Sequence, residues 1–257
     1  MSSVPAVTPA ERFDELFHDP VYLKFKEHLF SYLRRRDAIL EALPQEQGVV
    51  VEIGAGTCPV TTSGAAIIHS DISEQAMRTL KAEGRRSQLS VFSAGEISLA
   101  TECIDTVICS EVLEHIDDDQ GALAEIARIL RCGGTAILTV PVHSYYFASD
   151  DIFVGHRRRY SVSAFVDRLR QLGFSDFTVV KVSGPLEKLA TLVTVRVYQV
   201  LSKRQSRAHR SIHNFLPAFK LANRLFVTLI KWESKLLPLS LTTIVLIRCR
   251  KFSEQSS

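Results

Sequence analysis

An apolar run that ends in a glycine-containing turn, VVVEIGAGTCP at residues 49–59, limits the possible folds most strongly. The run is typical of a strand that is covered on both faces of a parallel sheet. Gly54 and Gly56 let the backbone approach a ligand closely, and the N-terminus of a following helix favours a phosphate or nucleotide. The pattern therefore predicts a strand, a turn and a short helix, which Pro59 would begin, beside a nucleotide-like ligand.

A second apolar run, IIHSD, ends at Asp71, which lies 71 − 52 = 19 residues after Glu52. A carboxylate at the end of the second strand of such a unit can accept hydrogen bonds from both ribose hydroxyls. Asp71 is therefore a candidate ligand-binding residue.

Strand and helix patterns alternate along the next hundred residues. Ser73 is a candidate N-cap for a helix that ends at Gly84, and the amphipathic segment 123–130 stops at Gly133 and Gly134. This rhythm predicts an α/β fold with a doubly wound, mostly parallel sheet and a crevice beyond the carboxyl ends of its strands. The expected strands are 49–53, 67–71, 89–92, 104–109, 135–140 and 177–182.

The segment EVLEHI, residues 111–116, follows the fourth of these strands. Residues 49–141 resemble the class I S-adenosylmethionine-dependent methyltransferases of the small-molecule type, which carry such a segment there. The resemblance implies a Rossmann-like sheet of seven strands, in which residues 242–248 pair beside the sixth strand as an antiparallel edge. It also implies S-adenosylmethionine as cofactor.

The resemblance implies a role for several residues near the crevice. Two positions depart from the family pattern, since Cys58 replaces a third glycine and Ala94 or Gly95 replaces an aspartate that binds the adenine amino group. The cofactor residues implied are Glu52, Gly54, Ala55 and Gly56 at the methionine end, Asp71 and Ile72 at the ribose and adenine, Glu96 and Ile97 at the adenine edge, and Glu111 at the amino group or the substrate.

Past Pro141, an aperiodic segment is expected to form a long loop over the crevice. It contains GHRRRYS, residues 155–161, which resembles a GHYRRYS element of methyltransferases in this branch. Arg158 and Arg159 can grip a phosphate or carboxylate, and Tyr160 can orient a hydroxyl. The alternative is structural, with arginines pairing to Asp150 and Asp151 to fasten the loop. The catalytic candidates are His143, His156 and Tyr160, and the substrate-binding candidates are His115, Tyr145, Arg158 and Arg159.

The charge is distributed unevenly. Lys and Arg minus Asp and Glu give 17 − 25 = −8 for residues 1–180 and 14 − 3 = +11 for residues 181–257. Residues 185–238 are an insertion in the expected fold. Their pattern predicts two amphipathic helices with basic flanks, and such helices are suited to binding an anionic membrane. The alternative is a helical subdomain that packs on the sheet edge or forms a dimer interface. The arginine run 34–36 is expected to be a solvated helix face.

Four segments follow from these patterns. Residues 1–46 are expected to form N-terminal cap helices, with helical spacing over 9–43, and residues 253–257 a disordered tail. Residues 47–184 and 239–252 form the expected methyltransferase domain, and residues 185–238 form the insertion.

The function expected is methyl transfer to an oxygen of a small or lipid-linked, anionic acceptor, such as a sugar, an isoprenoid or a polyketide-like metabolite. The alternatives are an RNA ribose methyltransferase and a noncatalytic scaffold that keeps the fold. Base methylation of nucleic acid is disfavoured, because SEVL rather than an Asn/Asp-Pro-Pro-aromatic element follows the fourth strand.

Five cysteines without a C-x-x-C pair predict a reduced chain with no metal site. The chain shows neither a signal peptide nor a run of apolar residues long enough to span a membrane. A cytoplasmic monomer or homodimer, with peripheral contact at the inner face of the membrane, is expected.

Overall fold

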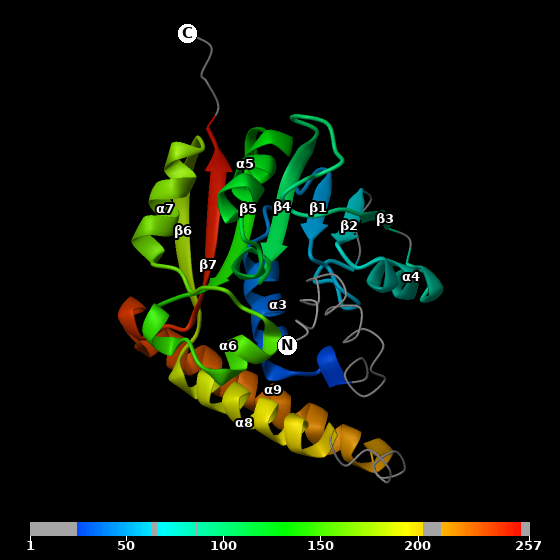
Figure 1. The fold of residues 1–257 in the computed structure, drawn as a ribbon, viewed down its shortest axis with the longest axis vertical. Helices are drawn as coiled ribbons and strands as arrows, with labels where there is room; N and C mark the ends of the chain where they lie inside the picture. Colours follow the sequence, from blue (N-terminus) through cyan, green and yellow to red (C-terminus); the bar gives the residue numbers. More distant parts are fainter. Residues whose placement is uncertain (1–24, 63–65, 86, 203–211, 253–257) are drawn as a thin grey trace, which may run out of the picture.

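A seven-stranded sheet forms the centre of the computed structural model, which describes residues 25–62, 66–85, 87–202 and 212–252 (Figure 1). The strand order is β3-β2-β1-β4-β5-β7-β6, and β7 runs antiparallel to both of its neighbours. The predicted doubly wound, mostly parallel fold is therefore confirmed. The strands are β1 (Val50–Ile53), β2 (Ile67–Asp71), β3 (Gln88–Val91), β4 (Ile104–Ser110), β5 (Leu130–Pro141), β6 (Phe174–Ser183) and β7 (Ile244–Lys251).

Two expectations about strands were wrong. The last strand, β7, lies between β5 and β6, so that β6 forms the edge of the sheet. β5 begins at Leu130, directly after a helix, and contains the two glycines that were expected to end that helix. Gly133 has a φ of +78°, and the pairing of β4 with β5 shifts register between Ile104 and Thr106. The glycines therefore accommodate an irregularity within a strand.

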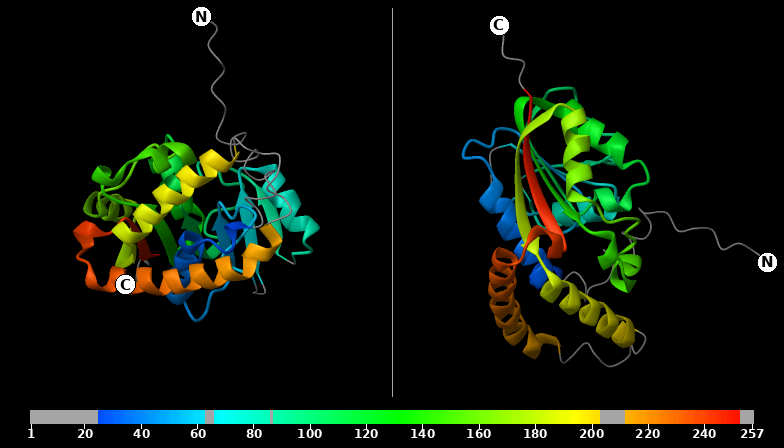
Figure 2. Two further views of the ribbon diagram at one scale, coloured as in Figure 1. Left: turned by 90° about the horizontal axis from the view of Figure 1, so that it is seen from below. Right: turned by 90° about the vertical axis from the view of Figure 1, so that its left-hand side faces the viewer.

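Helices cover both faces of the sheet (Figure 2). On one face, α3 (Phe30–Ala42) buries Ala38 and Ile39 against strand residues such as Ile108 and Leu246. On the other face, α5 (Asp119–Ile129) and α7 (Val162–Gln171) pack over the largest apolar cluster, which includes Leu123, Ile126 and Phe165. At the β3 side, α4 (Glu74–Ala82) begins at Ser73, whose side chain accepts a hydrogen bond from the Ala76 amide as predicted.

Short helices occupy the segments after β4 and β5. η1 (Leu113–His115) follows β4, whereas η2 (Ser144–Tyr146) and α6 (Ser149–Val154) lie where a long loop was expected. The described residues 54–62 form turns and extended chain, so a helix beginning at Pro59 was also a wrong expectation.

The insertion forms the two predicted helices, α8 (Pro185–Ser202) and α9 (Ile212–Leu236), followed by η3 (Leu239–Leu241). They run past the end of the sheet at which the parallel strands finish (Figure 1). α9 packs against α3, where Val227 and Ile230 bury Phe30 and the Asn223 side chain accepts a hydrogen bond from the Phe30 amide at 3.0 Å. No helix in the described part of the chain is long and apolar enough to cross a membrane.

The arginine run on α3 is not a solvated face. Arg34 is only 3% exposed and donates to the Lys181 carbonyl at 3.4 Å, while Arg35 and Arg36 are half-buried. Burial lowers the pKa of Arg34. The prediction failed because α9 and β6 cover this side of the helix, and neither contact is visible in the local pattern. The predicted helical residues 9–24 and the tail 253–257 lie outside the described residues.

We expect Asp105→Ala to lower the free energy of unfolding by about 1–2 kcal/mol at pH 7. The Asp105 carboxylate accepts the Val49 amide at 2.7 Å and pairs with Arg131 at 2.8 Å at the amino ends of β1 and β4. The Val49 hydrogen bond and Arg131 outweigh desolvation and lower the pKa of Asp105. The contribution of the Asp105 carboxylate to stability is therefore complete above the pKa that this group has in the unfolded chain. It is lost as the pH falls through the lower pKa of the folded state. Urea unfolding should show that the difference from wild type shrinks below about pH 4; a constant difference would contradict this.

Gly54→Ala should destabilise the protein more than Gly84→Ala, although both glycines have a φ of +72°. The left-handed backbone alone costs an alanine about 1–2 kcal/mol. A Cβ on Gly54 would also lie 2.2 Å from the Val112 Cγ2 atom, whereas a Cβ on Gly84 meets nothing within 4 Å. Urea unfolding of the two variants measures the contribution of this packing, and equal losses would show that the Val112 contact relaxes freely.

Candidate functional site

The turn after β1 is fixed to the end of β2 by Asp71. One carboxylate oxygen accepts the Gly56 amide at 2.8 Å, and the other accepts the Ser73 amide at 2.9 Å. Gly54 and Gly56 both have positive φ angles, of +72° and +56°. Asp71 therefore lies at the carboxyl edge of the sheet, next to a turn whose backbone only glycine adopts readily.

Glu52 lies in β1, just before the glycine turn as predicted, and is only 3% exposed. It accepts the amides of Val60 and Thr61 at 2.7 and 3.0 Å and the Thr61 hydroxyl at 2.6 Å. Burial raises its pKa despite these hydrogen bonds. Glu52 thus holds the chain after the glycine turn, and its direct contact with a cofactor stays a prediction.

Apolar and polar groups line the remainder of this edge. Ile72 is 40% exposed beside Asp71, whereas Ala55 is buried against α4. Glu96 is exposed, while Ile97 is buried and its amide donates to the Glu125 carboxylate at 3.0 Å. The Ile97 amide is therefore already bonded, and contact of Glu96 with an adenine stays a prediction.

Glu111 follows β4 with a φ of +55°, which is uncommon for a residue with a side chain. Its carboxylate accepts the Thr139 hydroxyl at 3.3 Å and lies 3.9 Å from the Arg35 guanidinium. Sequence analysis did not identify Arg35 as a partner of Glu111, because α3 is distant from β4 in the chain. Strained non-glycine residues concentrate at functional sites, so Glu111 marks this end of β4.

A second residue of this kind, His143, has a φ of +61° just after β5. Its Nε2 donates to the Leu239 carbonyl at 3.0 Å, and its ring stacks on Tyr145 at 5.1 Å. Tyr145 donates its hydroxyl hydrogen to the Ser240 carbonyl. A carbonyl only accepts, so Nε2 carries the proton and Nδ1 of neutral His143 keeps its lone pair.

The GHRRRYS element is mostly structural. Arg159 is buried and donates to the Asp151 carboxylate at 2.9–3.0 Å and to the Val142 and Thr243 carbonyls. Tyr160 is 6% exposed and donates to Asp119 at 2.9 Å. Burial, with the negative charge of Asp119, raises the pKa of Tyr160. Arg159 and Tyr160 thus make structural contacts, and substrate binding by Arg159 and catalysis by Tyr160 stay predictions.

The partners of the other arginines were not foreseen. Arg158 pairs with Asp119 at 3.0 Å, and Arg157 pairs with Asp117 and donates to the His115 carbonyl. A substrate role for Arg158, whose side chain is 34% exposed, stays a prediction. The expected alternative of a fastened loop is confirmed for Arg159 and Asp151, whereas Asp150 pairs with Lys188 of α8 at 2.7 Å.

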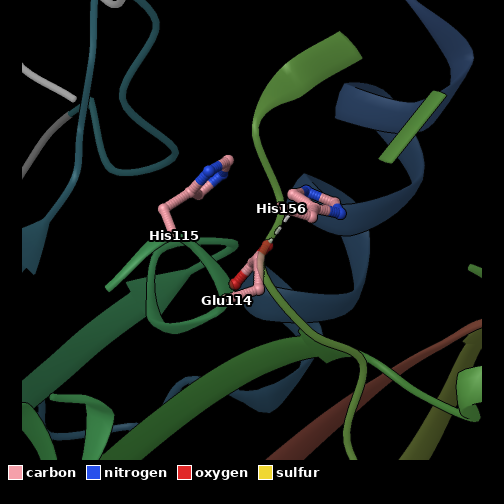
Figure 3. Close-up of side chains that lie close together, drawn as sticks. All are labelled: Glu114, His115 and His156. Carbon is pink, nitrogen blue, oxygen red and sulfur yellow. Dashed lines mark ion pairs between the residues drawn. The ribbon is translucent and has the colours of Figure 1, made fainter. Parts of the chain in front are cut away.

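His115, His156 and Glu114 come together beside η1 (Figure 3). His115 Nδ1 contacts the Gly155 carbonyl at 3.2 Å, and His156 Nδ1 contacts Asp151 at 2.8 Å. Glu114 lies in the segment EVLEHI, yet sequence reasoning assigned it no role. Its full burial depends on packing between η1 and the chain after α6, which the sequence pattern does not reveal.

The geometry at the ends of β1 and β2 fits S-adenosylmethionine. The backbone at Gly54 and Gly56 leaves no side chain over the turn, the Asp71 carboxylate lies at the end of β2 where a ribose would bind, and Ile72 offers an apolar surface to a base. Cys58 is half-buried rather than turned fully outward, and burial raises the pKa of its thiol.

Comparison with known proteins identifies a methyltransferase domain in the central segment of the chain. Residues 51–138 match the family model described as a methyltransferase domain. Over 151 residues the chain is 26% identical to a ubiquinone biosynthesis O-methyltransferase of Parvibaculum lavamentivorans, covering 51% of this chain and 60% of that protein. A protein of the same name from Rhizobium rhizogenes is 33% identical over 101 residues, 36% of this chain and 41% of that one. The match thus spans less than two thirds of either relative.

Solved structures share the fold over nearly the whole chain. A Thermotoga maritima methyltransferase, described as a possible histamine N-methyltransferase, aligns with a TM-score of 0.63 at 20% identity over 95% of this chain and 100% of its own. Phosphoethanolamine N-methyltransferase 2 of Haemonchus contortus, in complex with S-adenosylmethionine, aligns with a TM-score of 0.64 at 14% identity over 97% of this chain and 61% of its own. Residues 51–138 thus match a methyltransferase domain, and the chain as a whole has the fold of these methyltransferases.

Proposed function

We propose that this chain binds S-adenosylmethionine and transfers its methyl group to an oxygen of a small or lipid-linked acceptor. The observation that carries the proposal is the Asp71 carboxylate, which lies at the crevice edge and holds the glycine turn by the Gly56 amide. The name O-methyltransferase of the matched relatives supports oxygen as the acceptor atom.

S-adenosylmethionine, when bound, supplies a methyl group on a sulfonium that an acceptor oxygen can attack directly. The chain then has to align the acceptor, exclude water and take up the hydroxyl proton. In our proposal Asp71 and Ile72 hold the ribose and adenine, and Glu111 faces the amino group or the acceptor. His143 is the proposed base, since its Nδ1 keeps a lone pair while Nε2 is bound to Leu239.

The acceptor proposed is anionic, because residues 181–257 carry a net charge of +11. A lipid-linked sugar, an isoprenoid or a polyketide-like metabolite with a phosphate or carboxylate meets this description. RNA also offers phosphates and ribose hydroxyls, so labelled methyl transfer to RNA instead of these acceptors would contradict the proposal.

Isothermal titration of S-adenosylmethionine and S-adenosylhomocysteine into the purified chain tests the cofactor site. We expect micromolar binding that Asp71→Ala weakens by about 10- to 100-fold, since two charge-assisted hydrogen bonds are lost. Asp105→Ala is the matched control, because it also removes a carboxylate bound to a backbone amide, but at the amino ends of the strands. No binding of either ligand by the wild-type chain would favour a noncatalytic scaffold, whereas equal binding by wild type and Asp71→Ala would contradict the proposed role of Asp71.

A lipid-linked acceptor requires access to a membrane, and α9 offers a suitable surface. Exposed apolar side chains follow one another at helical spacing along it, with Lys220, Arg224 and Lys235 on the same helix. The exposed set is Leu221, Leu225, Leu229, Trp232 and Leu236, each between 57% and 78% exposed. We propose that this surface binds an anionic lipid bilayer, which places the chain peripherally at the cytoplasmic face.

Trp232 is the single tryptophan of the chain and therefore reports on this contact directly. We expect its fluorescence to shift to shorter wavelength with phosphatidylglycerol vesicles and much less with phosphatidylcholine vesicles. The double variant Leu225→Glu/Leu229→Glu should weaken vesicle binding by at least about tenfold, since it removes apolar contact and adds repulsion. Leu40→Glu, which places the same charge at an exposed position of α3, should bind like wild type. The proposal would be contradicted if the chain bound both kinds of vesicle equally and the double variant bound like wild type. Self-association of the chain through this face would also contradict it.

A further inference from the structure

The imidazole of His69 is buried in β2, which lies between β1 and β3 in the sheet (Figure 1). The residue is only 1% exposed, and both ring nitrogens have hydrogen-bond partners. Nε2 lies 2.9 Å from the Thr61 carbonyl oxygen and 3.0 Å from the Thr61 hydroxyl, and Nδ1 lies 2.8 Å from the Ser87 hydroxyl. His69 therefore joins the segment after the glycine turn to the segment before β3.

The hydrogen bonds of His69 fix its tautomer. A carbonyl oxygen only accepts, so Nε2 carries a proton and donates it to Thr61. In the neutral ring Nδ1 keeps a lone pair, which accepts the hydrogen of the Ser87 hydroxyl. In the protonated ring Nδ1 donates instead, and the Ser87 hydroxyl accepts, because a hydroxyl can do either. Both protonation states of His69 are thus compatible with the same hydrogen-bond geometry.

The charge of His69 acts on Glu52, which lies beside it in the parallel register of β1 and β2. Glu52 Oε2 lies 3.8 Å from His69 Nε2, and this oxygen also accepts the Thr61 amide at 3.0 Å and the Thr61 hydroxyl at 2.6 Å. Oε1 accepts the Val60 amide at 2.7 Å. Because both oxygens accept, these bonds favour the carboxylate of Glu52. A positive charge on His69 therefore draws Oε2 toward the ring and away from the Thr61 amide.

Charged groups on the elements packed against this pair also act on it. Burial lowers the pKa of His69, and the positive charge of Arg85, which pairs with Glu83 at 3.4 Å, acts in the same direction. Burial raises the pKa of Glu52, whereas its hydrogen bonds and the positive charge of Lys26 lower it. The ring of His69 is therefore neutral at pH 7, and it takes up a proton only as the pH falls below the ordinary histidine pKa of about 6.5.

A shift of Glu52 is transmitted to the glycine turn through a short piece of chain. Residues 57–59 separate the Gly56 amide, which Asp71 binds, from the Val60 amide, which Glu52 binds. The Tyr32 hydroxyl of α3 donates to the Pro59 carbonyl at 3.1 Å and restrains this piece from the other side. The contacts of Glu52 with residues 60 and 61 therefore influence how the turn is presented to the crevice.

We propose that His69 is a positioning residue for the cofactor turn, acting through Thr61 and Glu52, and that its protonation weakens the binding of S-adenosylmethionine. Neutral His69 holds the Thr61 carbonyl, so that the amide and hydroxyl of Thr61 stay directed at Glu52. Protonated His69 competes with the Thr61 amide for Oε2 and loosens the chain that leaves the turn. The inference rests on the proposed cofactor site and adds a pH dependence to it.

The coupling is tested first without cofactor, in the full chain. Nuclear magnetic resonance of labelled protein follows the His69 ring and the amides of Val60 and Thr61 from about pH 8 to about pH 5. We expect both amides to shift with the same midpoint as the ring, and these shifts to vanish in His69→Gln. Amides that stay constant while His69 titrates, or a ring that stays neutral down to pH 5, would overturn the inference.

Calorimetric titration with S-adenosylmethionine gives the functional readout. We expect the Kd of wild type to rise by about three- to tenfold between about pH 7.5 and pH 5, because one proton opposes binding. His69→Gln keeps a donor for the Thr61 carbonyl but does not titrate, so it should bind like wild type at pH 7.5 and lack this rise. His69→Leu removes the donor and should bind at least about threefold more weakly at both pH values.

His28→Gln is the matched control. His28 precedes α3, lies near Lys220 and Arg224 of α9, and also has a pKa that burial lowers. Its replacement should leave the rise in Kd as large as in wild type, since His28 has no contact with Thr61 or Glu52. A loss of the rise in His28→Gln, or its persistence in His69→Gln, would contradict the assignment to His69.

The two measurements separate this inference from the proposed function. If wild type and His69→Gln bind S-adenosylmethionine with the same pH dependence, the inference fails and the cofactor site stands. If wild type binds no S-adenosylmethionine at any pH, the proposed function fails, and the effect on affinity fails with it. The resonances of Val60 and Thr61 then still decide whether His69 positions the turn.

Discussion

The carboxylate of Asp71 determines how the first two strands present their ends to the crevice. It holds the Gly56 amide of one turn and the Ser73 amide of the next, and Ser73 in turn caps α4 through the Ala76 amide. The Asp71 side chain thus positions both the glycine turn and the start of α4, and these two hydrogen bonds also fix its own orientation. Glu52 performs the corresponding task on the buried side of the turn, where it binds two amides and a hydroxyl. Ligand contact at this edge therefore depends on charge-assisted hydrogen bonds to backbone.

Two other aspartates hold the chain segments that follow β4 and β5. Asp119, at the start of α5, receives Tyr160, Arg158 and Arg168. Asp151 receives His156, Arg159 and Lys188. These contacts join α5, α6, α7 and α8 around the segment that carries His156. A site whose side chains come from several elements needs such support if its geometry is to be maintained.

Local patterns identified most elements, because burial of a parallel strand and capping of a helix depend on nearby residues. The runs at β1 and β4, the Ser73 cap and the two helices of the insertion were all predicted. The antiparallel pairing of β7 with β6 was predicted as well, but the position of β7 inside the sheet was not, since strand order is settled by packing across the whole sheet. The same limit applies at the site. The arginines of GHRRRYS are visible in the sequence. The groups that they contact, however, lie up to 84 residues away, as for Arg159 and the Thr243 carbonyl.

The position of β7 also dictates the order in which the sheet can be completed. β6 pairs with β7 alone, and β7 begins only after α8 and α9. As the chain leaves the ribosome, β5 therefore keeps an open edge and β6 has no neighbour until the entire helical insertion has been synthesised. Open edges invite pairing with other chains. The two helices, which lie past the same end of the sheet, thus emerge during the interval in which the nascent protein is most exposed to misassembly.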